Sequence, residues 1–215
     1  MSDLIIACGA LARDIITIRN KYGWDAQVLA VPAILHNRPE QIPAAVQKRI
    51  QESRQDHARV IVVYGECGTR GVLDHIVHDE DAIRISGPHC YEQYAGESFD
   101  KLMSEEPGTF FLTDFLAHAF EYYVVKGLGL DEHPELMDDY FGEYTRVVYL
   151  QQRVDTNLVK SAEKAAKFFN LPLQIHPTGF GALEDRLVEI IEGSETHNPL
   201  IYLERQELPS YGNNL

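Results

Sequence analysis

Three cysteines occupy the same kind of position in the chain, each close after a predicted buried strand. Cys8 ends the first predicted strand, Cys67 lies in the turn after the third, and Cys90 lies in the turn after the fourth. In an open parallel sheet, ligands bind outside the carboxyl ends of the strands, at the point where the strand order reverses. Each turn also leads into a predicted helix, and the amides at a helix N-terminus favour a thiolate over a thiol. We therefore expect the three thiols to lie in one crevice.

The shared position of the thiols predicts a metal site with Cys8, Cys67 and Cys90 as its ligands. A single cysteine at a strand end is more often a packing residue, but three thiolates in one crevice would repel one another unless a cation held them. An iron–sulfur cluster is the leading interpretation, because three protein ligands on a four-iron cluster leave one iron open to act as a Lewis acid on a small substrate. Zinc is the alternative, since a catalytic zinc site also combines three protein ligands with an open position.

Polar residues beside the cysteines are candidates for proton transfer and substrate binding. His89 adjoins Cys90, His36 follows the second predicted strand, and Glu66 adjoins Cys67. We take these two histidines and the glutamate as candidate catalytic residues that move protons or orient the substrate. Glycines in such turns let the backbone pass close to a bound group, and amides at a helix start hold anions. The candidate cofactor-binding residues on this basis are Gly9, Gly68, Thr69 and Arg70.

The glycine-rich turn at residues 65–71 follows a strand and opens a helix, as phosphate-binding loops do. It lacks the Gly-Lys-Ser/Thr ending of a Walker loop, and residues 8–10 are Cys-Gly-Ala, which is not the dinucleotide-binding fingerprint. The sequence contains no Gly-x-Ser-x-Gly elbow, so nothing supports a Ser-His-Asp triad. An anion held by backbone amides is compatible with a metal site in the same crevice.

Buried apolar runs alternate with amphipathic segments along the chain, which is typical of βαβ units. The strands are predicted at residues 4–8, 27–35, 59–64, 82–86, 109–112, 146–150, 171–175 and 200–203. Helices are predicted between them, for example at 39–55, 157–169 and 182–191. The sequence therefore predicts an α/β fold with a mostly parallel, doubly wound, Rossmann-like sheet flanked by helices. We expect a single domain over residues 1–193, followed by a C-terminal strand and polar tail at 194–215.

Composition excludes several classes of function for this chain of 215 residues. The net charge is −14, from 33 acidic against 19 basic side chains, whereas a duplex-binding protein needs a basic face. The apolar runs are far shorter than the roughly 20 residues of a membrane span, and the N-terminus has no basic signal-peptide region. Three widely spaced cysteines do not form a disulfide framework. We expect a cytoplasmic protein without a nucleic-acid or membrane partner.

Short motifs around the cysteines occur in a characteristic order. They are Ala-Cys-Gly at 7–9, Leu-His-x-x-Pro at 35–39, Tyr-Gly-Glu-Cys-Gly at 64–68, Pro-His-Cys-Tyr at 88–91 leading to Gly96, and Pro-Gly-Thr-Phe-Phe-Leu-Thr at 107–113. Over roughly residues 4–190, this set resembles the family called domain of unknown function 1638. Family members usually have Pro-Arg-x-His-Asp-Cys leading to Leu-Gly-Ser. This chain has Ser-Gly-Pro-His-Cys at 86–90 and Ala-Gly-Glu at 95–97, so the Arg and Asp are missing while the cysteines and His89 stay in register.

The resemblance implies a metabolic setting for the protein but assigns no reaction to it. Relatives are often encountered with corrinoid-dependent methyltransferases for methylated amines in anaerobic one-carbon metabolism, where an oxygen-sensitive cluster would survive. The resemblance implies, at most, a role in methyl transfer or corrinoid maintenance. The positions of the thiols themselves predict a metal-thiolate lyase or transferase that acts on a small-molecule substrate, with a zinc-thiolate site for methyl transfer as the alternative. A further interpretation is a non-catalytic accessory protein, whose partner would be a corrinoid protein or a methyltransferase and whose acidic surface would suit a basic patch on that partner.

Overall fold

A computed structural model describes residues 2–193 of the chain, and its strands form two parallel sheets. The first sheet has the order β2-β1-β3-β4 and the second has the order β5-β6-β7. The strands are β1 (Asp3–Cys8), β2 (Ala26–Val31), β3 (Val60–Val63), β4 (Ile83–Arg84), β5 (Thr109–Leu112), β6 (Arg146–Gln151) and β7 (Leu173–Pro177). The predicted strand at 200–203 and the polar tail at 194–215 lie outside the described residues.

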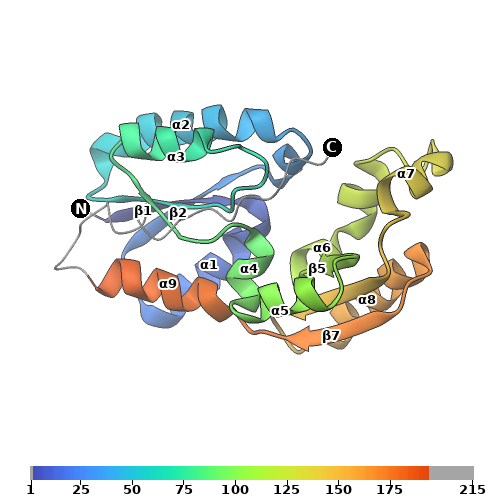
Figure 1. The fold of residues 1–215 in the computed structure, drawn as a ribbon. Helices are drawn as coiled ribbons and strands as arrows, with labels where there is room; N and C mark the ends of the chain where they lie inside the picture. Colours follow the sequence, from blue (N-terminus) through green and yellow to red (C-terminus); the bar gives the residue numbers. More distant parts are fainter. Residues whose placement is uncertain (1, 194–215) are drawn as a thin grey trace.

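Helices cover both faces of the first sheet, and this explains why its central strands are continuous apolar runs. In β1 the side chains of Leu4 and Ile6 pack against α2 (Ile42–Ser53) and α3 (Val72–Asp79). The alternate residues Ile5 and Ala7 face the other side, where α1 (Gly9–Tyr22) and α9 (Gly181–Glu192) pack. Figure 1 shows these two helical layers above and below the sheet.

The second sheet packs its own helices on one face and shares a core with the first sheet on the other. Its outer layer contains α6 (Asp114–His118), α7 (Met137–Phe141) and α8 (Thr156–Phe169). On the inner side, Phe111, Val148 and Leu150 belong to the same core as β1 and α9. The helices α4 (Cys90–Ala95) and α5 (Ser98–Glu105) lie between the two sheets (Figure 1). Short 3-10 helices span Ala33–Asn37, Pro39–Gln41, Arg54–Asp56 and Pro134–Leu136, and a π-helical segment spans Glu121–Lys126.

The predicted α/β fold with parallel strands and flanking helices is confirmed, and the structure divides its strands between two sheets. The division follows β4, in which only Ile83 and Arg84 pair with β3. Gly87 and Pro88 then lead the chain out of the sheet and into α4 and α5. The predicted second strand is also shorter than expected, because Pro32 lacks an N–H for the ladder and residues 33–37 form a 3-10 helix. Among the described residues, no helix is both long enough and apolar enough to span a membrane.

A buried ion network joins the two sheets. The guanidinium of Arg153, which follows β6, pairs with Asp14 of α1 and lies 3.3 Å from the carboxylate of Asp114 in α6. Tyr94 donates a hydrogen bond to Asp14 and Tyr149 donates one to Asp114, both at 2.6 Å. Both aspartates are 4% exposed, so their carboxylates depend on these partners for stability.

We predict that Arg153→Ala destabilises the protein by roughly 3 kcal/mol, because it leaves two buried carboxylates without a cation. Urea unfolding measures this change in the free energy of unfolding. Lys48→Ala is the control, since Lys48 forms an exposed ion pair with Glu52 at 3.8 Å and its loss should change stability by less than about 0.5 kcal/mol. Equal effects of the two substitutions would show that the network does not hold the sheets together.

Candidate functional site

The three cysteines line one cavity of about 260 Å³ at the carboxyl edge of the first sheet. The strand order reverses between β1 and β3, so this edge is the place where ligands bind in open α/β sheets. Cys8 is the last residue of β1, Cys67 lies in the turn after β3, and Cys90 is the first residue of α4. His36, from the 3-10 helix after β2, lines the same cavity. The expectation that the thiols share one crevice agrees with this arrangement.

Cys67 and Cys90 interact directly and share one proton. A hydrogen bond from the Cys90 thiol is the largest cause that lowers the pKa of Cys67, to about 4, and a hydrogen bond from His36 lowers it further. The same contact with Cys67 raises the pKa of Cys90 well above its usual value. The hydrogen bond to Cys67 also raises the pKa of His36. At neutral pH the side chains therefore form a Cys67 thiolate and a Cys90 thiol, and the contact with Cys67 favours the protonated form of His36.

Cys8 is held as a thiol on the other side of the cavity. Burial raises its pKa, and the negative charge of Cys67 raises it as well. The hydroxyl of Tyr64, a residue that is 1% exposed, forms a hydrogen bond with Cys8. Burial also raises the pKa of Tyr64, so this hydroxyl stays protonated. Without a bound cation, the three sulfur atoms thus have one negative charge between them.

His89 directly precedes Cys90 and caps the N-terminus of α4. Its Nδ1 accepts a hydrogen bond from the Tyr91 amide at 3.2 Å and lies 3.6 Å from Cys90 Sγ. Its ring stacks on the ring of Tyr91, with 4.5 Å between the centroids, and the His36 ring is 6.4 Å away. Burial lowers the pKa of His89, so its imidazole is neutral. The site therefore favours the charged form of the His36 imidazole and the neutral form of the His89 imidazole.

The turn that presents Cys67 has a strained backbone. Cys67 has φ 45° and Arg70 has φ 53°, both in the left-handed region that costs a non-glycine residue about 1 kcal/mol. The carbonyl of Glu66 accepts hydrogen bonds from the amide and hydroxyl of Thr69, each at 2.9 Å. The Glu66 carboxylate accepts one from the Gly71 amide at 3.2 Å. Strain of this kind persists where the surroundings enforce it, often at functional sites.

A close backbone contact brings the turn after β3 against the start of α4. A Cβ at Gly65 would lie 2.8 Å from the amide nitrogen of Cys90 and 3.0 Å from the Cα of His89. The Glu66 amide also donates a hydrogen bond to the Pro88 carbonyl at 2.9 Å. Only glycine fits at position 65, and its absence of a side chain lets Cys67 approach Cys90.

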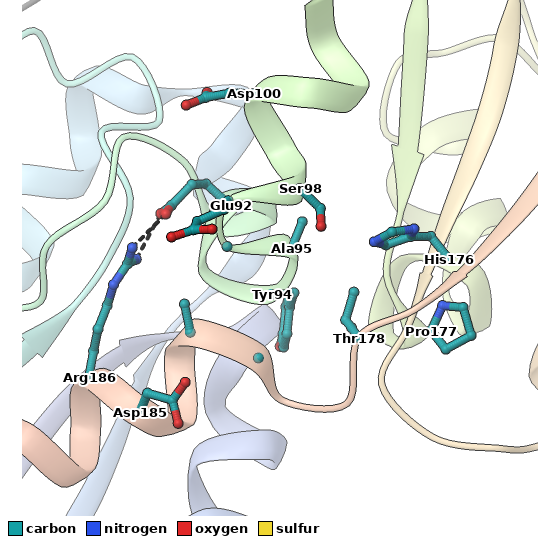
Figure 2. Close-up of a pocket in the computed structure, with 14 residues that line it drawn as sticks. Glu92, Tyr94, Ala95, Ser98, Asp100, His176, Pro177, Thr178, Asp185 and Arg186 are labelled. Carbon is teal, nitrogen blue, oxygen red and sulfur yellow. Dashed lines mark hydrogen bonds and ion pairs between the residues drawn. The ribbon is translucent and has the colours of Figure 1, made fainter. Parts of the chain in front are cut away.

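Helix α4 is anchored on the side away from the cavity. Arg186 of α9 pairs with both carboxylate oxygens of Glu92, at 2.7 and 2.5 Å, and donates a hydrogen bond to the Ser86 carbonyl at 2.9 Å. Figure 2 shows this pair at one end of a separate, open hollow, with His176 at the opposite wall. Because Glu92 and Cys90 share one short helix, this ion pair fixes the position of the thiol.

The other candidate residues from the sequence lie outside the cavity lining. The Thr69 hydroxyl and the Glu66 carboxylate form hydrogen bonds within the turn, and Glu66 also lies 3.9 Å from Arg84. Gly68 and Arg70 are exposed. Gly9, at the start of α1, packs closely against the backbone of residues 31–33. These residues shape the turns that position the thiols.

Sequence reasoning missed the aromatic wall that the second sheet contributes. The cavity is also lined by Phe110 of β5, Phe115 of α6, Tyr123 of the π-helical segment and Phe141 of α7. The aromatic density of residues 115–123 was the available signal, but a helix of this composition is usually core. Tyr64 and Gly65 were also missed, although both stand within a motif that includes Cys67.

The thiols, as positioned, do not converge on a single point. Within residues 2–193, no group of three or more Cys, His, Asp and Glu side chains is arranged to hold one metal ion. Cys67 contacts Cys90 and His36, whereas Cys8 contacts Tyr64. The donor set is therefore a contacting pair of thiols with a third thiol across the same cavity.

Comparison with known proteins gives a family and no described activity. The family described as protein of unknown function (DUF1638) matches residues 30–187, which is more than half of the chain. No curated protein and no solved structure matches the chain. The matched region includes Cys67, Cys90, His36 and His89, and Cys8 precedes it.

We predict that Cys67 of the chelator-treated, metal-free protein reacts with iodoacetamide at a rate that stays nearly constant from about pH 8 down to about pH 5. Its lowered pKa keeps the sulfur ionised over this range, and the rate should fall only as the pH approaches that pKa. Peptide mass spectrometry measures the labelling of each cysteine. In Cys90→Ala the pKa of Cys67 should rise, because its hydrogen-bond donor is lost, so labelling at about pH 6 should slow. A Cys67 rate that instead climbs steadily through about pH 7–9, as for an ordinary thiol, would contradict this assignment.

Proposed function

We propose, for a chain that belongs to the DUF1638 family, that it binds an iron–sulfur cluster through Cys8, Cys67 and Cys90 and acts as an enzyme on a small substrate. The observation that supports this function is that all three cysteines of the chain line one cavity. They reach it from three separate strand ends, at the edge where α/β sheets bind their ligands. Packing alone does not require three thiols at such a place.

The electrostatics of the cavity favour a bound cation. The three sulfurs have one negative charge between them, because Cys90 and Cys8 keep their protons while Cys67 is ionised. A metal replaces the protons of thiol ligands, so its binding would ionise all three at once and release protons. Tyr64 and His36 then stand beside the sulfurs as hydrogen-bond donors, which is how proteins tune metal-thiolate centres.

Either metal would require the thiols to move from the positions they have in the structure. A tetrahedral zinc ion with Zn–S bonds of about 2.3 Å needs its sulfurs within roughly 4 Å of one another, and the described side chains offer no such group of three. An iron–sulfur cluster has its irons at separate corners, which suits Cys8 across the cavity, but Cys67 and Cys90 would have to leave their mutual contact to bind separate irons.

The chemistry then divides between the cluster and the protein. With three protein ligands, a bound four-iron cluster would supply an open Lewis-acid position. His36 lines the cavity and holds a proton beside Cys67, so it would deliver or accept a proton there. His89 is neutral and positions Cys90. The aromatic residues would give the substrate an apolar surface opposite the sulfurs.

A second candidate function rests on the contact between Cys67 and Cys90. A thiolate beside a thiol, with an imidazolium next to it, is also the arrangement of a dithiol that reduces disulfides. Cys67 would attack one sulfur of a substrate disulfide and release the other sulfur as a thiolate, which leaves a mixed disulfide on Cys67. Cys90 would then lose its proton and attack the Sγ of Cys67, which gives a Cys67–Cys90 disulfide and releases the second substrate sulfur as a thiolate. In this mechanism Cys8 is not required.

We predict that protein purified without exposure to air contains about four iron and four sulfide per chain. Cys8→Ala, Cys90→Ala and Cys67→Gly should each lose most of both. Glycine is chosen at position 67 because it accepts φ 45° without strain, so this variant should fold at least as well as the wild type. Elemental analysis and the visible absorption spectrum report the content.

The matched control is His78→Ala, which removes an exposed histidine of α3 outside the cavity and should leave the iron unchanged. Zinc in place of iron, at one per chain and lost in all three cysteine variants, would select the zinc alternative. Protein free of metal, in which only Cys67 and Cys90 are needed for disulfide reduction, would replace the proposed function with the second candidate.

A further inference from the structure

The cavity has two unlike walls from different halves of the molecule. The first sheet contributes the thiol wall of Cys8, Cys67 and Cys90 together with His36. The opposite wall comes from the second sheet and its helices, through Phe110, Phe115, Leu116, Tyr123 and Phe141. In Figure 1, β5 and α6 lie on the other side of α4 from the first sheet. A molecule in the cavity would contact sulfur on one side and aromatic rings on the other.

The lining offers little to a charged ligand. Among the described residues that line the cavity there is no Lys, Arg, Asp or Glu, and His36 is engaged with Cys67. Two of the neutral polar groups in the lining are also occupied. Thr113 accepts a hydrogen bond from the Leu116 amide at 3.3 Å, and Tyr94 donates one to Asp14 at 2.6 Å. Because Cys67 and His36 are engaged with each other, the described lining offers a carboxylate, phosphate or ammonium group no free side chain of opposite charge in exchange for its hydration.

The volume sets the size of the ligand. At about 260 Å³ the cavity is slightly smaller than the roughly 300 Å³ at which drug-binding pockets begin. An apolar cavity of about 150 Å³ accepts benzene. A cluster bound to the three thiols would occupy the thiol side of this space, so the remainder holds at most one ring with a short substituent or an alkyl compound of the same size.

We infer that the substrate is an uncharged small molecule with an apolar body about the size of one ring, which lies against the aromatic wall and presents a neutral polar or sulfur-containing end to the thiol wall. The assignment of this end as the reacting end rests on the proposed function. The binding of the apolar body rests only on the cavity.

Three probes that share one ring test the inference: benzyl alcohol, benzoate and benzylammonium. Calorimetric titration of the anaerobically purified protein measures the Kd of each. We expect benzyl alcohol to bind at least about tenfold more tightly than either charged probe, since burial of an unpaired charge costs more than the 1.4 kcal/mol that a factor of ten represents. Tighter or equal binding of benzoate or benzylammonium would overturn the inference.

Variants connect the binding to the cavity. Leu116→Trp fills the space from α6, on the side of the aromatic wall, so it should weaken benzyl alcohol binding at least about tenfold without loss of iron. Tyr122→Trp is the matched control, because Tyr122 is 59% exposed and does not line the cavity. Unchanged binding in a folded cavity-filling variant would also overturn the inference.

A last variant separates this inference from the proposed function. Cys67→Gly should lose iron yet still bind benzyl alcohol, because the aromatic wall is intact. If the wild type contains no iron but shows the expected order of probes, the proposed function fails and the inference about the apolar body stands. If iron is present and the probes bind in another order, the inference fails alone.

Discussion

The main constraint on this site is that three thiols share a cavity with apolar walls and cannot all ionise there. Cys67 is ionised because Cys90 and His36 donate hydrogen bonds to it. The same contact keeps Cys90 protonated, and burial keeps Cys8 protonated. A cation that displaced these protons would remove the conflict, since the charge of each thiolate would then be paired. The inability of the three thiols to ionise together supports a metal cofactor more strongly than the identity of any single residue does.

The rest of the structure holds the sulfurs in place. The reversal of strand order at β1 and β3 creates the crevice, and Gly65 lets the turn with Cys67 approach Cys90. The strained conformation at Cys67 would be relieved by glycine, so the sulfur is retained at a cost in stability. Arg153 holds the second sheet against the first through Asp14 and Asp114. The aromatic wall therefore stands at a fixed distance from the thiols.

The sequence predicted the parallel α/β fold and the shared position of the cysteines because both depend on local patterns. Continuous apolar runs such as that of β1 require a sheet covered on both faces, and a residue at the end of such a strand must lie at the carboxyl edge. The division into two sheets was not predictable in this way, since it depends on how few residues of β4 pair with β3.

The aromatic wall was missed for a similar reason. Phe110 and Phe141 are far from the cysteines in sequence, and only tertiary packing brings them to the cavity. Glu66 looked catalytic beside Cys67, but the turn uses its carboxylate as a hydrogen-bond acceptor.

The most direct test is a crystal structure of anaerobically purified protein, with anomalous diffraction recorded on both sides of the iron absorption edge. Our account predicts an iron-specific peak inside the cavity, bonded to the Sγ atoms of Cys8, Cys67 and Cys90. Iron-free density in which Cys8 remains against Tyr64, while Cys67 and Cys90 are either free or joined by a disulfide, would contradict it.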